Sequence, residues 1–368
     1  MRNFAYRVLP FLLIVLLGGC SAAKFIPEGE HMLESVSVKT TDKALDVGLL
    51  KGYIRQHPNS KWFSLLKVPM GPYVISGTDT TKRINRFLQR VGEAPVIFDT
   101  LQASRSEENM LSAVNNLGFL NATITQKKTF KKKKVKLVFE VSPGPRYKVR
   151  HIDYRIEDSI VRRIVNENSS LTLLQSGIPF DLNVLDAERG RISNRLQNSG
   201  YYKFNKEYIR YEADTCVGNH EVDLKVLIPL YRASANEAPE MHRRYMINRV
   251  AFSGGAVSLD SHTDTASLDK TVYKGQPIYY KRRLFFRPSV FTDNNLIREN
   301  GLYRESDVQR TYGNYGRLGA VMFSNIKIEE NDSLPNRLDC YVTLHENKAR
   351  TVGAEIEGTN SAGDLGAA

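Results

Sequence analysis

Apolar and polar positions alternate in several short stretches of this chain, and helical patterns lie between them. Residues 33–38 alternate with a period of two, which predicts a strand. Further on, Met110, Val114 and Leu117 contribute to an apolar stripe at helical spacing. The first unit is therefore predicted to contain a strand at 33–38, helices at 44–56, from Thr78 to about Val91 and from Ser106 to Gly118, and strands at 119–124 and 135–141.

The same order of elements is predicted twice more. The second unit is expected to have a strand from Tyr147, helices at 159–165 and 181–198, and strands at 201–211 and 222–228. The third is expected to have a strand at 245–252, helices at 289–298 and 305–318, and strands at 322–328 and 338–344. The sequence also repeats directly, since Arg-Tyr-Lys-Val-Arg-His-Ile at 146–152 returns as Arg-Tyr-Met-Ile-Asn-Arg-Val at 244–250. These patterns predict an α+β fold of about three tandem β-α-α-β-β repeats.

Turn-forming and polar segments separate the predicted repeats. Pro143-Gly144-Pro145 is a predicted hinge before the second repeat, and the segment from Arg232 to His242 has little apolar content. A chain of 368 residues is long enough for two or three domains. The predicted organisation is a signal peptide at 1–19, repeats at 20–143, 144–231 and 244–347, a linker at 232–243, and the start of a β-barrel at 348–368.

The first residues form a predicted secretion signal. Arg2 and Arg7 precede and flank an apolar run at 9–17, which ends at Leu17-Gly18-Gly19-Cys20. A cysteine after small residues resembles the lipobox of bacterial lipoproteins, so Cys20 is predicted to carry lipid, including palmitate. A membrane-spanning helix is the alternative, but it needs about 20 apolar residues and this run is shorter. Ser21 after the cysteine favours sorting to the outer membrane.

Charge and cysteine content restrict the classes of partner. The chain has 52 Lys and Arg against 40 Asp and Glu, a net charge of +12, which favours anionic partners. Export excludes nucleic acid, leaving lipid head groups, lipopolysaccharide or acidic client segments. Besides Cys20, only Cys216 and Cys340 occur, and they fall in different repeats, so no disulfide framework is expected.

No pattern of catalytic or metal-binding residues emerges. The 7 histidines are scattered, and His-Glu-x-x-His, Cys-x-x-Cys and Gly-x-Ser-x-Gly motifs are all absent from the sequence. An enzyme would need a nucleophile or an acid-base pair, and the sequence offers neither at a recognisable spacing. We therefore expect no enzymatic activity, no metal and no cofactor.

Several motifs together resemble a known domain. An aromatic residue follows a glycine at the end of the second helix in Gly118-Phe119 and Gly200-Tyr201, and Gly-Pro-x-Tyr-x-Val opens the second repeat at 144–149. With the β-α-α-β-β order, these features resemble POTRA domains. The lipobox and the Phe-Ile-Pro-Glu-Gly-Glu segment at 25–30 make residues 24–347 similar to the lipidated, TamL-like members of the BamA/TamA family of Bacteroidetes-type bacteria.

The resemblance implies a function in outer-membrane protein assembly, as in a translocation and assembly module. A periplasmic POTRA arm would bind unfolded outer-membrane client proteins by strand addition and pass them to a β-barrel. It implies periplasm-spanning or assembly-machine partners and attachment to the membrane by the lipid anchor and a barrel. Residues 351–358 resemble a first barrel strand, so the chain is expected to be a fragment or a truncated product.

Two groups of side chains are candidate sites. By resemblance, Tyr201, Tyr202 and Phe204 are predicted to lie on a client-binding edge strand, although such aromatic residues also pack sheets onto helices. Tyr279, Tyr280, Arg282 and Arg283 form a basic and aromatic insertion in the repeat expected nearest the membrane. The lysines at 127, 128 and 131–134 are expected to form a solvated hairpin tip or, alternatively, to contact anionic lipid.

One alternative function remains open at this point. The chain could be a stand-alone periplasmic lipoprotein scaffold that ends naturally at Ala368 and binds a defined partner. A protein of that kind would need no barrel and no unfolded client. An anchored enzyme is the third class, and it lacks a candidate active site.

Overall fold

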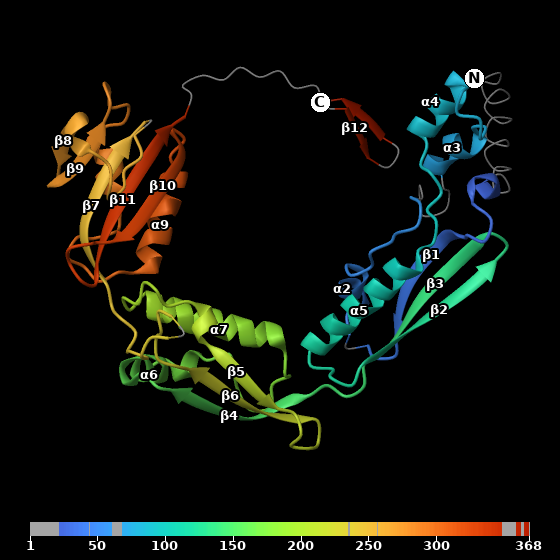
Figure 1. Ribbon diagram of the computed structural model, residues 1–368, viewed down its shortest axis with the longest axis horizontal. Coiled ribbons are helices and arrows are strands. Elements are labelled where there is room, and N and C mark those ends of the chain that lie inside the picture. Colours follow the sequence, from blue (N-terminus) through green and yellow to red (C-terminus); the bar gives the residue numbers. More distant parts are fainter. Residues whose placement is uncertain are drawn as a thin grey trace. The chain divides into compact units, whose positions relative to one another are not determined.

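The computed structural model describes residues 22–43, 45–60, 68–234, 236–255, 257–347, 358–361 and 364–367. Within these residues the chain forms two compact units, one containing 22–147 with 179–181 and the other containing 148–178 with 182–347. The predicted signal peptide, Cys20 and residues 351–357 lie outside the described residues. Each unit is built from small sheets covered by helices (Figure 1).

The first unit contains a three-stranded sheet. Its strands are β1 (Met32–Thr40), β2 (Thr123–Lys131) and β3 (Lys134–Ser142), in the order β1-β3-β2. The central strand β3 is parallel to β1 and antiparallel to β2. Helix α5 (Thr100–Asn116) buries Met110 and Val114 against Val135 and Phe139 of β3. The apolar stripe predicted from the sequence is therefore the core-facing side of this helix.

Several predicted element boundaries in this unit are wrong. The helix predicted from Thr78 begins only at Arg83, and the strand predicted at 119–124 begins only at Thr123. The long helix begins at Thr100 instead of Ser106, because the carboxylate of Asp99 accepts hydrogen bonds from the backbone N–H groups of Leu101 and Gln102. Ser106 lies inside the helix, where its hydroxyl donates to the carbonyl of Gln102 over 2.7 Å. The helix expected at 44–56 is reduced to α2 (Val47–Lys51).

A small helical insertion lies between α2 and α5. It contains η3 (Val68–Met70), α3 (Gly71–Ile75) and α4 (Arg83–Val91). Met70 and Val74 pack with Ala22, Ile26 and Met32 in a cluster separate from the main core. The segment η2 (Ala22–Phe25), which opens the described chain, is thereby held against the insertion.

The second unit begins with another three-stranded sheet. Its strands β4 (Lys148–Ile156), β5 (Arg210–Asp214) and β6 (Glu221–Ile228) follow the order β4-β6-β5, with the same parallel and antiparallel pairings as the first sheet. The remaining elements are α6 (Ser159–Asn166), η4 (Ser169–Leu171), α7 (Leu182–Gln197) and η5 (Lys206–Tyr208). Helices α6 and α7 lie close to their predicted positions.

The last sheet of the second unit has five strands in the order β10-β11-β7-β9-β8. Three of them, β7 (Met246–Gly254), β10 (Val321–Glu330) and β11 (Arg337–Glu346), reproduce the pattern of the other sheets. The sheet is accompanied by η6 (Thr265–Ser267), α8 (Pro288–Asp293) and α9 (Glu305–Gly316). The segment predicted as an insertion is a hairpin of β8 (Asp269–Tyr273) and β9 (Gln276–Tyr280), which adds to the sheet beside β7.

Near the end of the chain, β12 (Gly358–Ser361) pairs antiparallel with β13 (Asp364–Ala367). The structure thus confirms the α+β class and the recurrence of one sheet pattern along the chain. Among the helices that the structure describes, none is long and apolar enough to cross a membrane.

Candidate functional site

The repeated Arg-Tyr sequence forms the same set of contacts in both places. Arg146 donates through Nε to the carbonyl of Leu117 over 2.7 Å and lies over the ring of Phe119. Tyr147 donates its backbone N–H to the carbonyl of Gly118 over 2.8 Å. The arginine and the tyrosine therefore bind the chain on both sides of the glycine that ends α5.

The second copy repeats this arrangement within the second unit. Arg244 donates to the carbonyl of Ser199 over 2.9 Å and lies over the ring of Tyr201, while the N–H of Tyr245 donates to the carbonyl of Gly200 over 2.8 Å. We call the two contact sets the Arg-Tyr clasps. The sequence repeat thus encodes a contact between the end of a second helix and the residues that open the following strand.

The predicted strand at 201–211 is wrong in its first half. Residues 201–209 form turns and the short helix η5, and strand β5 starts only at Arg210. Tyr201 and Phe204 are buried, so neither presents an aromatic face on a sheet edge. The segment does not continue into a strand because Tyr201 and Phe204 are buried and line the pocket described below, and Tyr208 packs against Phe204 and His242. No finding tests client binding by Tyr201, Tyr202 or Phe204.

Tyr202 has a different position from the one predicted. Its hydroxyl donates to the carbonyl of Ile328 on β10 over 2.9 Å, and its ring packs edge-on against Tyr245 and Tyr303 at centroid distances of 5.8 and 5.0 Å. Burial raises the pKa of Tyr202, so the hydroxyl keeps its proton at neutral pH. Tyr202 therefore joins the loop after α7 to the last sheet.

A pocket of about 190 Å³ lies beside this contact. Its walls include the rings of Tyr201, Phe204, Tyr231 and Tyr245, and its polar lining includes Lys203 and Arg243. Lys203 pairs with Glu330 at 2.6 Å, and the hydrogen bond to that carboxylate raises the pKa of Lys203. The volume is sufficient for a single side chain, and the lining combines aromatic rings with charged side chains of both signs, including Glu237 and Glu240.

His242 closes the pocket from the segment predicted as a linker. Its backbone N–H donates to Asp158 over 3.0 Å, and its Nε2 lies 3.0 Å from the carbonyl of Pro229. Burial lowers the pKa of His242, although the Pro229 carbonyl and the Asp158 carboxylate oppose the shift. The ring also packs against Phe204 and Tyr208, so this end of the segment is fixed to the second repeat.

The first strand of each sheet is partly closed on its outer side. Residues 96–98 bond to 31–33, residues 177–180 bond to 147–149, and residues 300–303 bond to 245–247. In the last sheet, β9 covers a further part of β7 by pairing with Phe252 and Ser253. The outer strands of the last sheet are therefore β8 and β10, of which β10 is the longer strand.

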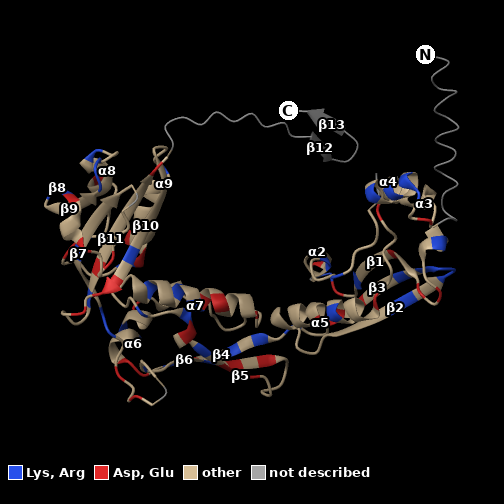
Figure 2. Ribbon diagram, turned by 45° about the horizontal axis from the view of Figure 1, so that its top comes forward, with Lys and Arg blue, Asp and Glu red and all other residues tan. Residues whose placement is uncertain are grey.

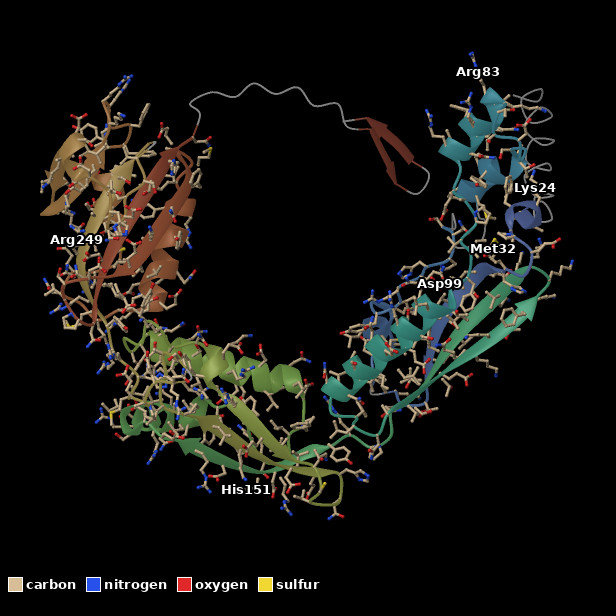
Figure 3. All side chains as sticks on the ribbon, viewed as in Figure 1. Lys24, Met32, Arg83, Asp99, His151 and Arg249 are labelled. Atoms are coloured by element: carbon tan, nitrogen blue, oxygen red, sulfur yellow. The ribbon has the colours of Figure 1, made fainter. Side chains whose placement is uncertain are left out.

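The outer strands β2 and β5 carry charges that disfavour pairing with another chain. The predicted hairpin tip is confirmed: Lys131 pairs with Lys134 at the end of β2 and β3, and the lysines at 127, 128, 131 and 132 are exposed. Strand β5 is short, and its exposed residues include Arg210, Glu212 and Asp214. Lysines, short length and charged side chains are features that protect sheet edges. The opposite outer strand of the sheet that contains β5 is β4, which carries His151, labelled in Figure 3.

Strand β10 differs from these edges. Two tyrosine hydroxyls bind its backbone at residues 326 and 328, and exposed apolar side chains lie at residues 322 and 323. The hydroxyl of Tyr312 on α9 donates to the carbonyl of Ile326 over 3.1 Å and accepts from its N–H over 2.8 Å. Since Tyr202 binds the carbonyl of Ile328, the backbone groups of residues 326 and 328 face away from β11. Outward groups recur at every second residue of an antiparallel edge, so those of Ser324 face outward too.

The unoccupied part of the edge is Met322, Phe323 and Ser324, which we call the β10 open edge. No hydrogen bond to an outward backbone group of Ser324 is present in the described part of the chain. Met322 is 57% exposed and Phe323 is 49% exposed, with its ring stacked on His345 at 4.0 Å. Exposed apolar residues beside unpaired backbone groups distinguish this edge from β5. On β2 the aromatic residue Phe130 is also exposed, at 53%, but it packs edge-on against His31 at 4.7 Å and has lysines on the same strand.

The predicted basic and aromatic group lies on and after β9. Tyr279 and Tyr280 are half-buried strand residues, and Arg282 and Arg283 are exposed in the turn that follows. Arg249, labelled in Figure 3, lies on the neighbouring β7 and donates to the hydroxyl of Tyr341 over 2.7 Å. No finding tests a membrane contact by these residues.

Metal-binding and disulfide chemistry have no visible basis in the described residues. No group of three or more His, Cys, Asp or Glu side chains there could hold a metal ion. Cys216 is exposed and Cys340 is buried, and both are free. Burial raises the pKa of the Cys340 thiol to about 12.

Comparison with known proteins gives similar solved structures at low sequence identity. POTRA domains 3–5 of BamA from Haemophilus influenzae are 14% identical, with 87% of this chain and 99% of that chain covered and a TM-score of 0.44. The N-terminal domain of Omp85 from Thermosynechococcus elongatus is 12% identical, covering 88% and 100%, with a TM-score of 0.27. POTRA domains 1–3 of Omp85 from Anabaena are 13% identical, covering 88% and 98%, with a TM-score of 0.28. No protein-family model and no curated protein matches the sequence.

Proposed function

We propose that this chain is the periplasmic arm of an outer-membrane protein assembly or translocation factor. Its POTRA-like repeats would bind unfolded client proteins by strand addition and pass them to a β-barrel. The tandem sheets, the Arg-Tyr clasps and the lipobox support this function. The β10 open edge is the single observation on which the mode of binding depends.

An extended client segment can pair with this edge through its backbone. Ser324 offers one N–H and one C=O in the outward direction, and main-chain hydrogen bonds require no particular client sequence. The exposed side chains of Met322 and Phe323 add apolar contacts beside the pairing site. A factor that receives many different clients needs this combination of sequence-independent pairing and nonspecific apolar contact.

A proline at position 324 tests strand addition directly. Because the N–H of Ser324 faces away from β11, Ser324→Pro removes the pairing donor without removing a bond of the β10–β11 ladder. We expect Ser324→Pro to weaken binding of a urea-denatured outer-membrane protein about five- to tenfold. The proline removes the one hydrogen bond that the N–H of residue 324 would donate to the client, and its ring blocks the edge there. Binding is measured by crosslinking from residue 323 after dilution of the client.

Ser324→Ala is the matched control, since it keeps the backbone N–H and should bind clients like the natural chain. Circular dichroism and the thermal midpoint establish that Ser324→Pro remains folded. Equal client crosslinking by the folded proline variant and the alanine variant would exclude the β10 open edge as the client-binding site. Phe204→Glu is unsuitable for this purpose, because Phe204 is buried and the change would destabilise its repeat whatever the protein binds.

The stand-alone periplasmic scaffold is retained as the alternative. Tyr279, Tyr280, Arg282 and Arg283 would then serve one defined partner, whereas in the assembly factor we propose that they face the membrane surface. A scaffold would bind its partner in the folded state and would ignore denatured clients. The client experiment therefore separates the two functions.

A further inference from the structure

Helix α4 has a polar side chain on its buried side and apolar side chains on its exposed side, which is the reverse of an ordinary surface helix. Asn85 faces inward and is only 8% exposed, and its side chain accepts from the N–H of Gly77 over 3.0 Å and donates to the carbonyl of Asp79 over 2.8 Å. On the opposite side, Ile84, Phe87 and Val91 are 68%, 63% and 62% exposed. A helix that keeps a polar residue inside and apolar residues outside needs a partner for its outer face.

The apolar side chains form one stripe along this face. At 100° per residue, positions 84, 87 and 91 fall within an arc of about 60°. The next positions around the helix are Arg83, Arg86 and Arg90, all exposed. Within the described residues, none of these three arginines forms an ion pair, and α4 contains no acidic residue. Figure 2 shows α4 in blue and tan without red.

The beginning of the described chain is fixed against the same insertion. Lys24 donates through Nζ to the carbonyl of Ser76 over 2.6 Å, and the ring of Phe25 packs against Tyr73 at 4.8 Å. Ala22 is buried in the cluster that contains Met70 and Val74. Figure 3 shows Lys24 beside this insertion and Arg83 projecting outward from α4.

These contacts place the insertion close to the predicted lipid anchor. Cys20 is two residues before Ala22 in the sequence, and two residues span at most about 7 Å. Acyl chains on Cys20 would therefore hold the segment at 22–26, together with the insertion packed on it, at the membrane surface. An apolar stripe bordered by arginines has the composition of a helix that lies in the interface of an anionic bilayer.

The geometry points to the exposed face of α4 as a second membrane contact, which docks on the anionic phospholipid surface beside the Cys20 anchor. Ile84, Phe87 and Val91 enter the boundary between head groups and acyl chains, and the three arginines bind lipid phosphates. This inference rests on the proposed lipid anchoring, which would hold α4 near the membrane surface. It does not depend on client binding at β10.

Vesicle flotation of the unlipidated mature chain, residues 20–368 with Cys20→Ser, tests the contact. We expect the chain to float with vesicles of phosphatidylethanolamine and phosphatidylglycerol, and to float less with phosphatidylcholine alone or at high salt. Ile84→Ser with Phe87→Ser should weaken binding at least tenfold through lost apolar burial. A triple variant should lower binding to anionic vesicles about fivefold for each arginine removed, and should leave binding to phosphatidylcholine vesicles unchanged. Its substitutions are Arg83→Gln, Arg86→Gln and Arg90→Gln.

Leu101→Ser is the matched control, because Leu101 is also exposed, at 55%, in the first unit but lies outside α4. It should float like the parent chain. Equal flotation of the parent and the Ile84, Phe87 double variant would overturn the inference, as would failure of the parent to bind anionic vesicles. If the parent chain self-associates without binding vesicles, and the double variant does not self-associate, the face would instead bind a second copy of the chain. Client binding, measured on the same variants, should be unchanged, so the outcome is separate from the test at Ser324.

Discussion

Gly200 illustrates how one backbone conformation determines a junction between elements. Its φ of +99° lies in a region that side chains rarely adopt, and a Cβ atom there would lie 2.7 Å from Cδ1 of Leu302. The carbonyl of Gly200 also accepts the N–H of Tyr245 in the second Arg-Tyr clasp. A single residue thus ends α7, leaves room for Leu302 and binds the start of the next repeat.

Gly200→Ala should lower the free energy of unfolding by about 1–3 kcal/mol, from backbone strain and the displacement of Leu302. Gly190→Ala is the control in the preceding helix α7, because a Cβ at Gly190 meets nothing within 4 Å. Alanine is the better helix former, so Gly190→Ala should raise stability by roughly 0.5–1 kcal/mol. Urea denaturation of both variants measures the difference. Equal stabilities would show that the junction tolerates a side chain at 200.

His242 should make the stability of the second unit depend on pH. Its pKa in the folded chain is lowered from 6.5, so the unfolded chain binds the proton more tightly. The stabilising contribution is therefore complete above pH 6.5 and is lost as the pH falls through that value toward the lower folded pKa. Thermal midpoints between about pH 5 and pH 8 measure the loss, which should be smaller in His242→Gln. An identical pH profile in both proteins would assign the dependence to other groups.

At the scale of single elements, the two tyrosines that bind β10, Tyr202 and Tyr312, limit the length of the open edge. Tyr312→Phe combined with Tyr202→Phe removes the hydroxyls that bind Ile326 and Ile328 and leaves those backbone groups free. We expect stronger crosslinking to denatured clients, because the available edge becomes longer, and a stability loss of about 1 kcal/mol per hydroxyl. Tyr280→Phe, at a half-buried tyrosine outside β10, should leave crosslinking unchanged. Weaker crosslinking of the folded double variant would mean that the hydroxyls help to hold the client.

Elements with strong periodicity were predictable from the sequence, and those defined by tertiary contacts were not. Helix α7 and strand β6 lie near their predicted ranges because their buried positions follow the helical or strand period. Strand β11 also lies near its predicted range, although it is buried on both faces. Residues 201–209 were predicted to belong to a strand, but Tyr201 and Phe204 are buried and line the pocket instead. Helix α5 was predicted to begin too late because Asp99 as a capping residue was not recognised.

The proposed client-binding edge was only partly predictable from the sequence. A client-binding edge after the helix-ending glycine was predicted in the second repeat, yet the strand there is short and charged. The closing strand of the third repeat was recognised, but its open backbone could not be inferred, since Tyr202 and Tyr312 reach β10 across 126 and 14 residues of sequence. Local periodicity carries no information about contacts at such separations.

At the scale of the whole molecule, the proposed anchoring predicts the state of the natural gene product. Intact mass of the protein from isolated outer membrane should show processing before Cys20 and added acyl chains, and Cys20→Ser should abolish both. A heavier species with heat-dependent gel mobility would indicate an arm that continues into a barrel. A lipidated species ending at Ala368 would favour the scaffold, and an unprocessed, unlipidated chain would refute the anchor.

The β8–β9 hairpin has a consequence for how many segments can bind at once. By pairing with β7, it leaves β8 and β10 as the outer strands of the last sheet, and part of β10 is already occupied by tyrosine hydroxyls. If clients bind only at the β10 open edge, the last sheet would take one extended segment at a time, with one-to-one stoichiometry. Successive strands of an unfolded protein would then have to bind in turn, each leaving before the next arrives, so the dissociation rate at β10 would set the pace of transfer.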